Sequence, residues 1–221
     1  MMPPDTLKLR VLQAVRQHPA PRRTDRLPSL LGSTAAGAVA MVAVSMWVPR
    51  MFGEVGGLAH AAGRPAESGA WILAGTLALA VASTWLVLPL RRSMLAPPRG
   101  VLLGVAIGVP LLIGAWLVPW HAAYADPYTR DGWRCFALTS LTAPWPFASL
   151  AYASRRVEPR HPGTTGAALG AVAGGWAAVM VELWCPLLAE RHVLVGHVLP
   201  LLSLALVGAA VGARMFRLRR V

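Results

Sequence analysis

The stretch Val101–Trp120, VLLGVAIGVPLLIGAWLVPW, contains twenty consecutive residues without a charged side chain. A helix rises about 1.5 Å per residue, so a run of this length crosses about 30 Å, the thickness of a bilayer's hydrocarbon core. In lipid, backbone N–H and C=O groups have to be satisfied within the segment itself. The run therefore predicts a membrane-spanning helix.

The rest of the chain repeats this pattern. Of its 221 residues 56% are hydrophobic and only 14% are charged, against about 25% charged in soluble domains. Six apolar blocks of membrane-spanning length follow one another with short connections: Leu30–Val48, Ala70–Leu90, Val101–Trp120, Trp133–Ala153, Thr164–Cys185 and Val193–Ala213. We expect an all-α membrane protein with six transmembrane helices arranged as three hairpins.

The basic residues indicate how these helices are oriented. Sixteen of the 21 Lys and Arg lie in four segments, residues 1–28, 91–100, 154–163 and 214–221, which alternate with poorly charged loops. Cytoplasmic loops carry the excess of Lys and Arg, so both termini are expected in the cytoplasm. The net charge of +12 is thereby explained by topology, and we expect no direct nucleic-acid partner. The chain then divides into a basic cytoplasmic tail (1–28), the bundle (29–213) and a second basic tail (214–221).

The first tail contains a short amphipathic pattern. Asp5 can cap a helix from Thr6 to about Gln17, and Leu7, Val11, Leu12 and Val15 fall on one face of it. The proline-rich segment 19–28 cannot continue that helix. Two interpretations stay open: a helix that lies on the anionic inner leaflet, or a docking helix for a cytoplasmic partner.

Two predicted spans carry glycine at every fourth position, which places the glycines on one helix face where another backbone can approach. The residues expected to pack helices in this way are Gly100, Gly104 and Gly108 in the third span and Gly166, Gly170 and Gly174 in the fifth.

Chemically reactive side chains collect where the predicted topology has its outer face. The stretch VELWCPLLAERHVLVGH, Val181–His197, contains Glu182, Cys185, His192 and His197, and Cys135 begins the fourth span on the same side. Glu182 is the one acidic residue inside a predicted span, and a carboxylate there is usually functional or paired. A Cys135–Cys185 disulfide, a metal or haem site, a sensing thiol and a plainly capped helix end are the competing interpretations.

The spacing of these residues matches no Cys-x-x-Cys, His-x-x-x-His or His-Glu-x-x-His motif, so we expect no bound metal and no cofactor. There is also no Ser/His/Asp set and no phosphate loop, and we expect a protein that is not an enzyme. The alternative is a small transporter or a membrane redox enzyme that uses Glu182, Cys185 and His197.

The second half of the chain carries a set of motifs in a fixed order. A cysteine opens the fourth helix, basic residues and prolines follow it, and a Gly/Ala-rich helix ends in Cys-Pro before a histidine and a final Gly-x-x-x-Gly-x-Arg. The residues are Cys135, Arg155, Arg156, Pro159, Pro162, Cys185, Pro186, His197, Gly208, Gly212 and Arg214. In these motifs the chain resembles the six-helix inner-membrane anti-sigma factors of the NrsF type, and among them the carotenogenesis regulators of myxobacteria.

The resemblance implies a multi-pass protein of the bacterial inner membrane that holds an extracytoplasmic-function sigma factor inactive until a signal releases it. For a carotenogenesis regulator the implied signal is light or photo-oxidative stress, and the regulon is carotenoid biosynthesis. The partners expected are thus a sigma factor and membrane lipid, and association with further copies of the chain stays open. We expect the sigma factor to contact Leu7, Val11, Leu12 and Val15, with Arg10 and Arg16 at the rim. Signal-sensing candidates are Cys135, Glu182, Cys185, His192 and His197.

Overall fold

The computed structural model describes residues 66–88, 97–123, 132–154, 159–183, 185 and 189–215, together with the single positions 13, 39 and 43. These residues form helices and short connections. The elements are α4 (Ala66–Val87), α5 (Arg99–Leu117), the 3-10 helix η2 (Val118–Ala123), α6 (Trp133–Thr142), α7 (Pro144–Ser154), α8 (Pro162–Glu182), α9 (Glu190–Val193), the π-helix η3 (Leu194–Val198) and α10 (Leu199–Met215).

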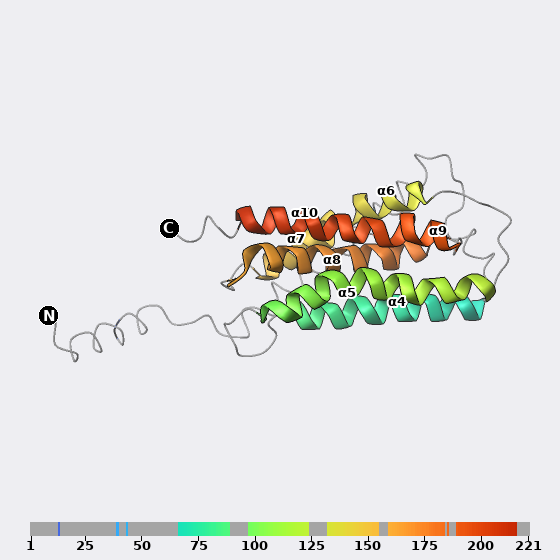
Figure 1. The fold of residues 1–221 in the computed structure, drawn as a ribbon, viewed down its shortest axis with the longest axis horizontal. Coiled ribbons are helices and arrows are strands. Elements are labelled where there is room, and N and C mark those ends of the chain that lie inside the picture. Colours follow the sequence, from blue (N-terminus) through green and yellow to red (C-terminus); the bar gives the residue numbers. More distant parts are fainter. Residues whose placement is uncertain are drawn as a thin grey trace.

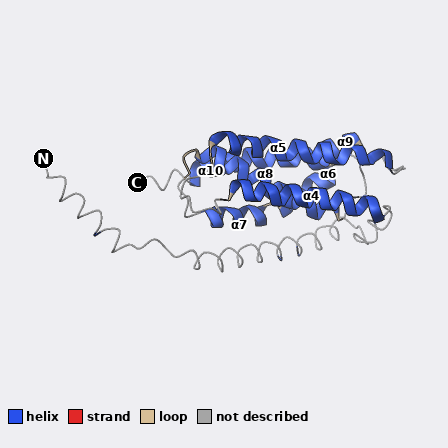
Figure 2. Cartoon of the chain, turned by 90° about the horizontal axis from the view of Figure 1, so that it is seen from below, coloured by secondary structure: helices blue, strands red, loops and turns tan. Residues whose placement is uncertain are grey.

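The long helices lie side by side along the longest axis of the molecule (Figures 1 and 2). The central helix is α8, which packs against α10, α5, α4, α7 and α6. Its Leu169 and Val172 belong to one apolar core with Leu102 and Ile113 of α5 and Leu201 of α10. Large apolar side chains such as Leu111 of α5 and Leu206 of α10 point outward, as they do in helices that face lipid.

Glycine lets α8 and α10 approach each other closely. A Cβ at Gly166 would lie 2.8 Å from Cα of Gly212 and also too close to Gly208, and a Cβ at Gly170 would meet Leu204. The start of α8 thus contacts the end of α10, so the two helices run antiparallel. The fifth-span glycines Gly166 and Gly170 meet the backbone of α10, and Gly174 meets the side chain of Leu201. These are the close contacts that small residues provide in lipid.

The predicted glycine row of the third span has no such close contacts within the described residues. A Cβ at Gly100, Gly104 or Gly108 would meet nothing within 4 Å in the part of the chain that the structure describes. Packing through this row therefore stays a prediction, because the first predicted span, Leu30–Val48, lies outside the described residues apart from the helical positions Val39 and Ala43.

Within the described residues, four helices are long and apolar enough to cross a membrane: Ser68–Val87, Arg99–Trp120, Pro162–Glu182 and Glu190–Met215. They correspond to the second, third, fifth and sixth predicted spans. The structure therefore supports an all-helical protein with four candidate spans, whereas six spans, their pairing into hairpins and the side of each terminus stay predictions.

The fourth predicted span, Trp133–Ala153, is covered by two helices that follow each other directly, with Ala143 between them in α-helical geometry, so a single span stays a prediction. These helices are α6 and α7, of 10 and 11 residues. Pro144 and Pro146 have no backbone N–H to donate to the preceding turn, and a proline ring inside a helix clashes with the carbonyl four residues before it. Helix α5 also contains a proline, the buried Pro110, and it continues through this residue as one helix.

Candidate functional site

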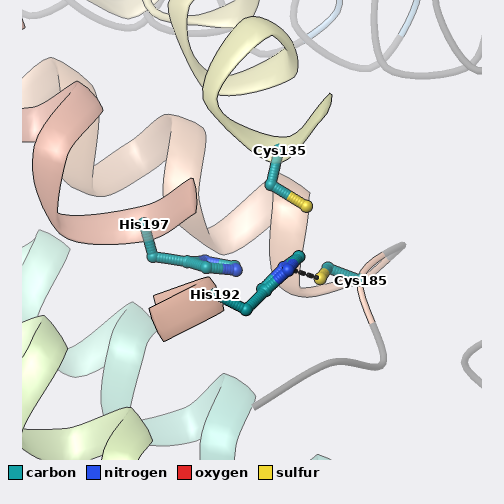
Figure 3. Close-up of side chains that lie close together, drawn as sticks. All are labelled: Cys135, Cys185, His192 and His197. Atoms are coloured by element: carbon teal, nitrogen blue, oxygen red, sulfur yellow. Dashed lines mark hydrogen bonds between the residues drawn. The ribbon is translucent and has the colours of Figure 1, made fainter. Parts of the chain in front are cut away.

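Four side chains that could bind a metal converge at the end of the bundle where α8 ends. Cys135 lies in the first turn of α6, Cys185 follows α8, His192 belongs to α9 and His197 to η3. One ligand atom from each lies within 4.8 Å of the others. Figure 3 shows the four side chains pointing toward one another from three segments of the chain. We call these residues the Cys–His cluster.

The cluster is enclosed and its members touch. Sγ of Cys185 is hydrogen-bonded to Nε2 of His192 at 3.1 Å, and the rings of His192 and His197 have centroids 5.6 Å apart. His197 is fully buried, His192 and Cys185 are nearly so, and Cys135 is half-buried. The acidity and reactivity of these side chains therefore depend on their contacts with one another rather than on contact with water.

Cys185 lies beyond the end of α8, and its thiol has a changed acidity. The hydrogen bond from the Cys135 thiol lowers the pKa of Cys185 well below its ordinary value, and His192 acts in the same direction, whereas burial raises it. A thiolate is both the nucleophilic and the metal-binding form of cysteine. Cys185 can therefore react with oxidants or bind a metal.

A π-helical turn explains how the two histidines come together. His192 and His197 are five residues apart, which in an α-helix of 3.6 residues per turn places them about 140° from each other. Between them η3 adopts π geometry, in which hydrogen bonds join residues five apart. The extra residue in the turn brings both rings to one side. A motif search based on α-helical spacing misses this pair for that reason.

Two glycines bring Cys135 to the cluster. A Cβ at Gly132 would lie 2.7 Å from Cα of Gly196, and a Cβ at Gly196 would lie 3.0 Å from Cβ of Cys135. The start of α6 can therefore approach η3 only because both positions lack a side chain. Sequence reasoning did not find Gly132 and Gly196, because each stands outside any repeated glycine pattern.

A carboxylate adjoins the cluster. Oε1 of Glu182 lies 2.9 Å from Nδ1 of His197, within the distance of an ion pair. Both side chains are completely enclosed. Two oppositely polarised groups at this distance stabilise each other most where water is excluded. Glu182 therefore orients the ring of His197.

The structure thus brings together all five residues that were predicted as signal-sensing candidates. It does not join Cys135 and Cys185 by a disulfide bond, although their sulfur atoms lie within 4.8 Å of each other. The predicted sigma-binding residues Leu7, Arg10, Val11, Leu12, Val15 and Arg16 lie outside the described residues. What the five clustered residues do stays a matter for proposal and test.

The contact between Gly132 and Gly196 leads to a testable expectation. Gly196→Val should push the start of α6 away from η3, because the new side chain meets Cys135 and the backbone of Gly132. Overpacking of this kind costs about 1–3 kcal/mol. We expect oxidant-induced disulfide formation between Cys135 and Cys185 to slow by about tenfold, a change that corresponds to about 1.4 kcal/mol. Non-reducing electrophoresis after a timed oxidant pulse measures the rate.

Gly163→Val is the matched control, because a Cβ at Gly163 would have ordinary contacts of 3.7 Å or more and lies at the other end of α8. Equal disulfide rates in the Gly196→Val variant and the unchanged chain would show that Gly196 does not position Cys135.

The described residues thus form four apolar helices of membrane-spanning length, which indicate association with a membrane, and an enclosed polar cluster at one end of the bundle. The family model described as "Negative regulator of sigma F" (NrsF) matches residues 12–218. The chain belongs to this family. Because the family's role is regulatory, the prediction of a protein that is not an enzyme is confirmed, and the alternative of a redox enzyme gains no support.

The chain is also similar to the "Probable anti-sigma-F factor NrsF" of Azospira oryzae. The two are 32% identical over 123 residues, which covers 51% of this chain and 56% of the relative. The match thus spans about half the length of that relative. No solved structure matches the chain.

Proposed function

We propose that this protein is a membrane-bound anti-sigma factor, which binds a sigma factor at the cytoplasmic face of the bacterial inner membrane and keeps it from RNA polymerase. The observation that carries the proposal is the family match over residues 12–218, which includes nearly the whole chain. The four apolar helices support a location in the membrane. We further propose that the partner is a sigma factor of the extracytoplasmic-function class.

The proposed contact surface is the basic tail of residues 1–28. A cytoplasmic partner needs an apolar surface outside the lipid, and Leu7, Val11, Leu12 and Val15 provide one on a single helical face. Both cysteines, Cys135 and Cys185, lie outside this tail, so the contact is independent of any zinc held by thiolates. Arg10 and Arg16 at its rim would pair with acidic groups of the sigma factor.

We propose that the Cys–His cluster lies at the outer face, across the membrane from the tail, and that Glu182 and the cluster receive the signal. The support is the distribution of basic residues, by which residues 154–163 and 214–221 are expected on the cytoplasmic side, and the end of α8 and the start of α6 on the other. By the resemblance to carotenogenesis regulators, we propose light or photo-oxidative stress as the signal and carotenoid biosynthesis genes as the regulon.

Polar substitutions on the apolar face of the tail test the proposal. Leu7→Asp combined with Leu12→Asp should release the sigma factor and derepress a reporter gene that depends on it. Burying one leucine contributes about 1.5–3 kcal/mol, so the loss of two weakens binding by about 100-fold or more. Reporter output in cells that carry the chain and the sigma factor is the measurement.

The control is Gln13→Asp combined with Gln17→Asp, which adds the same charge on the opposite face of the predicted helix. It should leave repression intact. If both pairs derepress the reporter equally, the apolar face is not the contact surface. If the unchanged chain does not repress at all, the anti-sigma function itself is wrong.

A further inference from the structure

We propose that the Cys–His cluster is a zinc site, in which Cys135, Cys185, His192 and His197 bind one Zn²⁺ and Glu182 orients His197 as a ligand. This proposal does not depend on the sigma factor, since it rests on the geometry at the end of α8. Two cysteines and two histidines form one of the common ligand sets of closed, four-coordinate zinc sites in proteins.

The distances suit such a site. Zn–S bonds of about 2.3 Å and Zn–N bonds of about 2.0–2.1 Å in a tetrahedron place the ligand atoms roughly 3.3–3.8 Å from one another. The four ligand atoms here all lie within 4.8 Å of one another, and Sγ of Cys185 is already 3.1 Å from Nε2 of His192. Binding therefore needs only small side-chain rotations, and no segment has to move into place.

A buried nitrogen of His197 indicates which atom would bind. Among the described residues its Nε2 has no hydrogen-bond partner, although the side chain is completely enclosed. A buried polar atom left in this state costs about 1–3 kcal/mol. A zinc ion among the two sulfur atoms and the two rings would provide the missing partner.

The other ring nitrogen of His197 also fits. Metal-binding histidines usually present their second nitrogen to a carboxylate, which fixes the tautomer and the orientation of the ring. Oε1 of Glu182 lies 2.9 Å from Nδ1 of His197, so a proton on Nδ1 would leave the lone pair of Nε2 available to the metal. The carboxylate in a membrane helix thereby acquires a positioning role.

The charges balance when the site is filled. Each thiol releases one proton on binding, and the imidazoles bind in their neutral form. One Zn²⁺ with two thiolates carries no net charge, which lowers the cost of burying the ion. Four protein ligands leave no open position for a substrate, so the site is structural. It would join the start of α6, the end of α8 and the α9–η3 turn.

Zinc content and cobalt substitution test the proposal on the full chain purified in detergent. We expect about one Zn²⁺ per chain, and after exchange with Co²⁺ the visible bands of tetrahedral cobalt with a thiolate charge-transfer band. X-ray absorption should show sulfur and nitrogen neighbours of the metal at about 2.3 Å and 2.0–2.1 Å. Cys185→Ser and His197→Ala should lose the zinc, whereas the exposed His161→Ala, at the other end of α8, should retain it.

Glu182→Gln separates the site from the fold, because it keeps all four ligands and changes only the group behind His197. Its zinc affinity, measured by competition with a chelating dye, should fall about 10–100-fold. The unchanged chain overturns the proposal if it purifies without zinc and gives no tetrahedral cobalt spectrum. It is also overturned if the metal has only nitrogen and oxygen neighbours, or if His161→Ala loses zinc as Cys185→Ser does.

Discussion

Gly166→Ala should destabilise the bundle by about 2 kcal/mol or more. The added methyl group would meet Cα of Gly212 at 2.8 Å and the backbone of Gly208, so a neighbouring helix has to move rather than a flexible side chain. Overpacking of a close-packed contact costs about 1–3 kcal/mol, and contact with backbone gives little room for relaxation. Thermal unfolding in detergent, followed by circular dichroism, measures the change.

Gly104→Ala in α5 is the matched control. It makes the same chemical change in another helix, but a Cβ there has no neighbour within 4 Å among the described residues. Alanine is about 0.8–1 kcal/mol better than glycine within a helix, and both variants gain this. We therefore expect Gly104→Ala to be neutral or slightly stabilising. Equal destabilisation by the two variants would show that α8 and α10 are not held by the contact at Gly166.

Glu182→Ala should destabilise the chain by about 1–3 kcal/mol, because it leaves the buried Nδ1 of His197 without an acceptor and opens a cavity beside it. Unfolding is measured with excess chelator present, so that metal binding does not contribute to the difference. Under the same conditions Glu182→Gln should recover part of the loss, because its amide oxygen can still accept from Nδ1.

Glu190→Ala is the corresponding control. Glu190 lies in α9 close to the same site, but its side chain is exposed, and surface substitutions usually change stability by less than about 0.5 kcal/mol. If Glu182→Ala unfolds with the same midpoint as Glu190→Ala, the contact with His197 does not stabilise the fold.

The apolar runs of the sequence predicted the long helices correctly, because apolar length is all that a candidate span requires. Arg99–Trp120 matches the predicted Val101–Trp120 to within two residues. The same criterion does not locate a break inside a run. The predicted span Trp133–Ala153 is covered by α6 and α7, and Pro144 and Pro146, which have no N–H group, lie where the second of these helices begins.

The residues of the candidate site could be predicted from the sequence, but their arrangement in space could not. Cys135, Glu182, Cys185, His192 and His197 were expected at one end of the bundle, and the structure brings them together. The expectation of no metal rested on α-helical spacing, which the π turn of η3 changes. No local sequence pattern predicts a π turn, because such a turn depends on the tertiary packing around it.

The glycines illustrate the same limit. The rows beginning at Gly100 and Gly166 have identical spacing, yet only the second meets another helix within the described residues. Glycine spacing shows that one face of a helix carries small residues, but only the fold shows whether another backbone lies against that face. The contact between Gly132 and Gly196 joins two positions far apart in the sequence, and neither belongs to a row.

Co-purification tests the central claim, that this chain holds a sigma factor at the membrane, most directly. The tagged full chain is extracted in detergent from cells that also produce the sigma factor encoded nearest to its gene, and the bound sigma factor is quantified. We predict near-stoichiometric recovery with the full chain and loss of nearly all of it when residues 1–26 are deleted. Unchanged recovery after the deletion would contradict binding through the tail. Absence of the sigma factor from the full chain would contradict the claim itself.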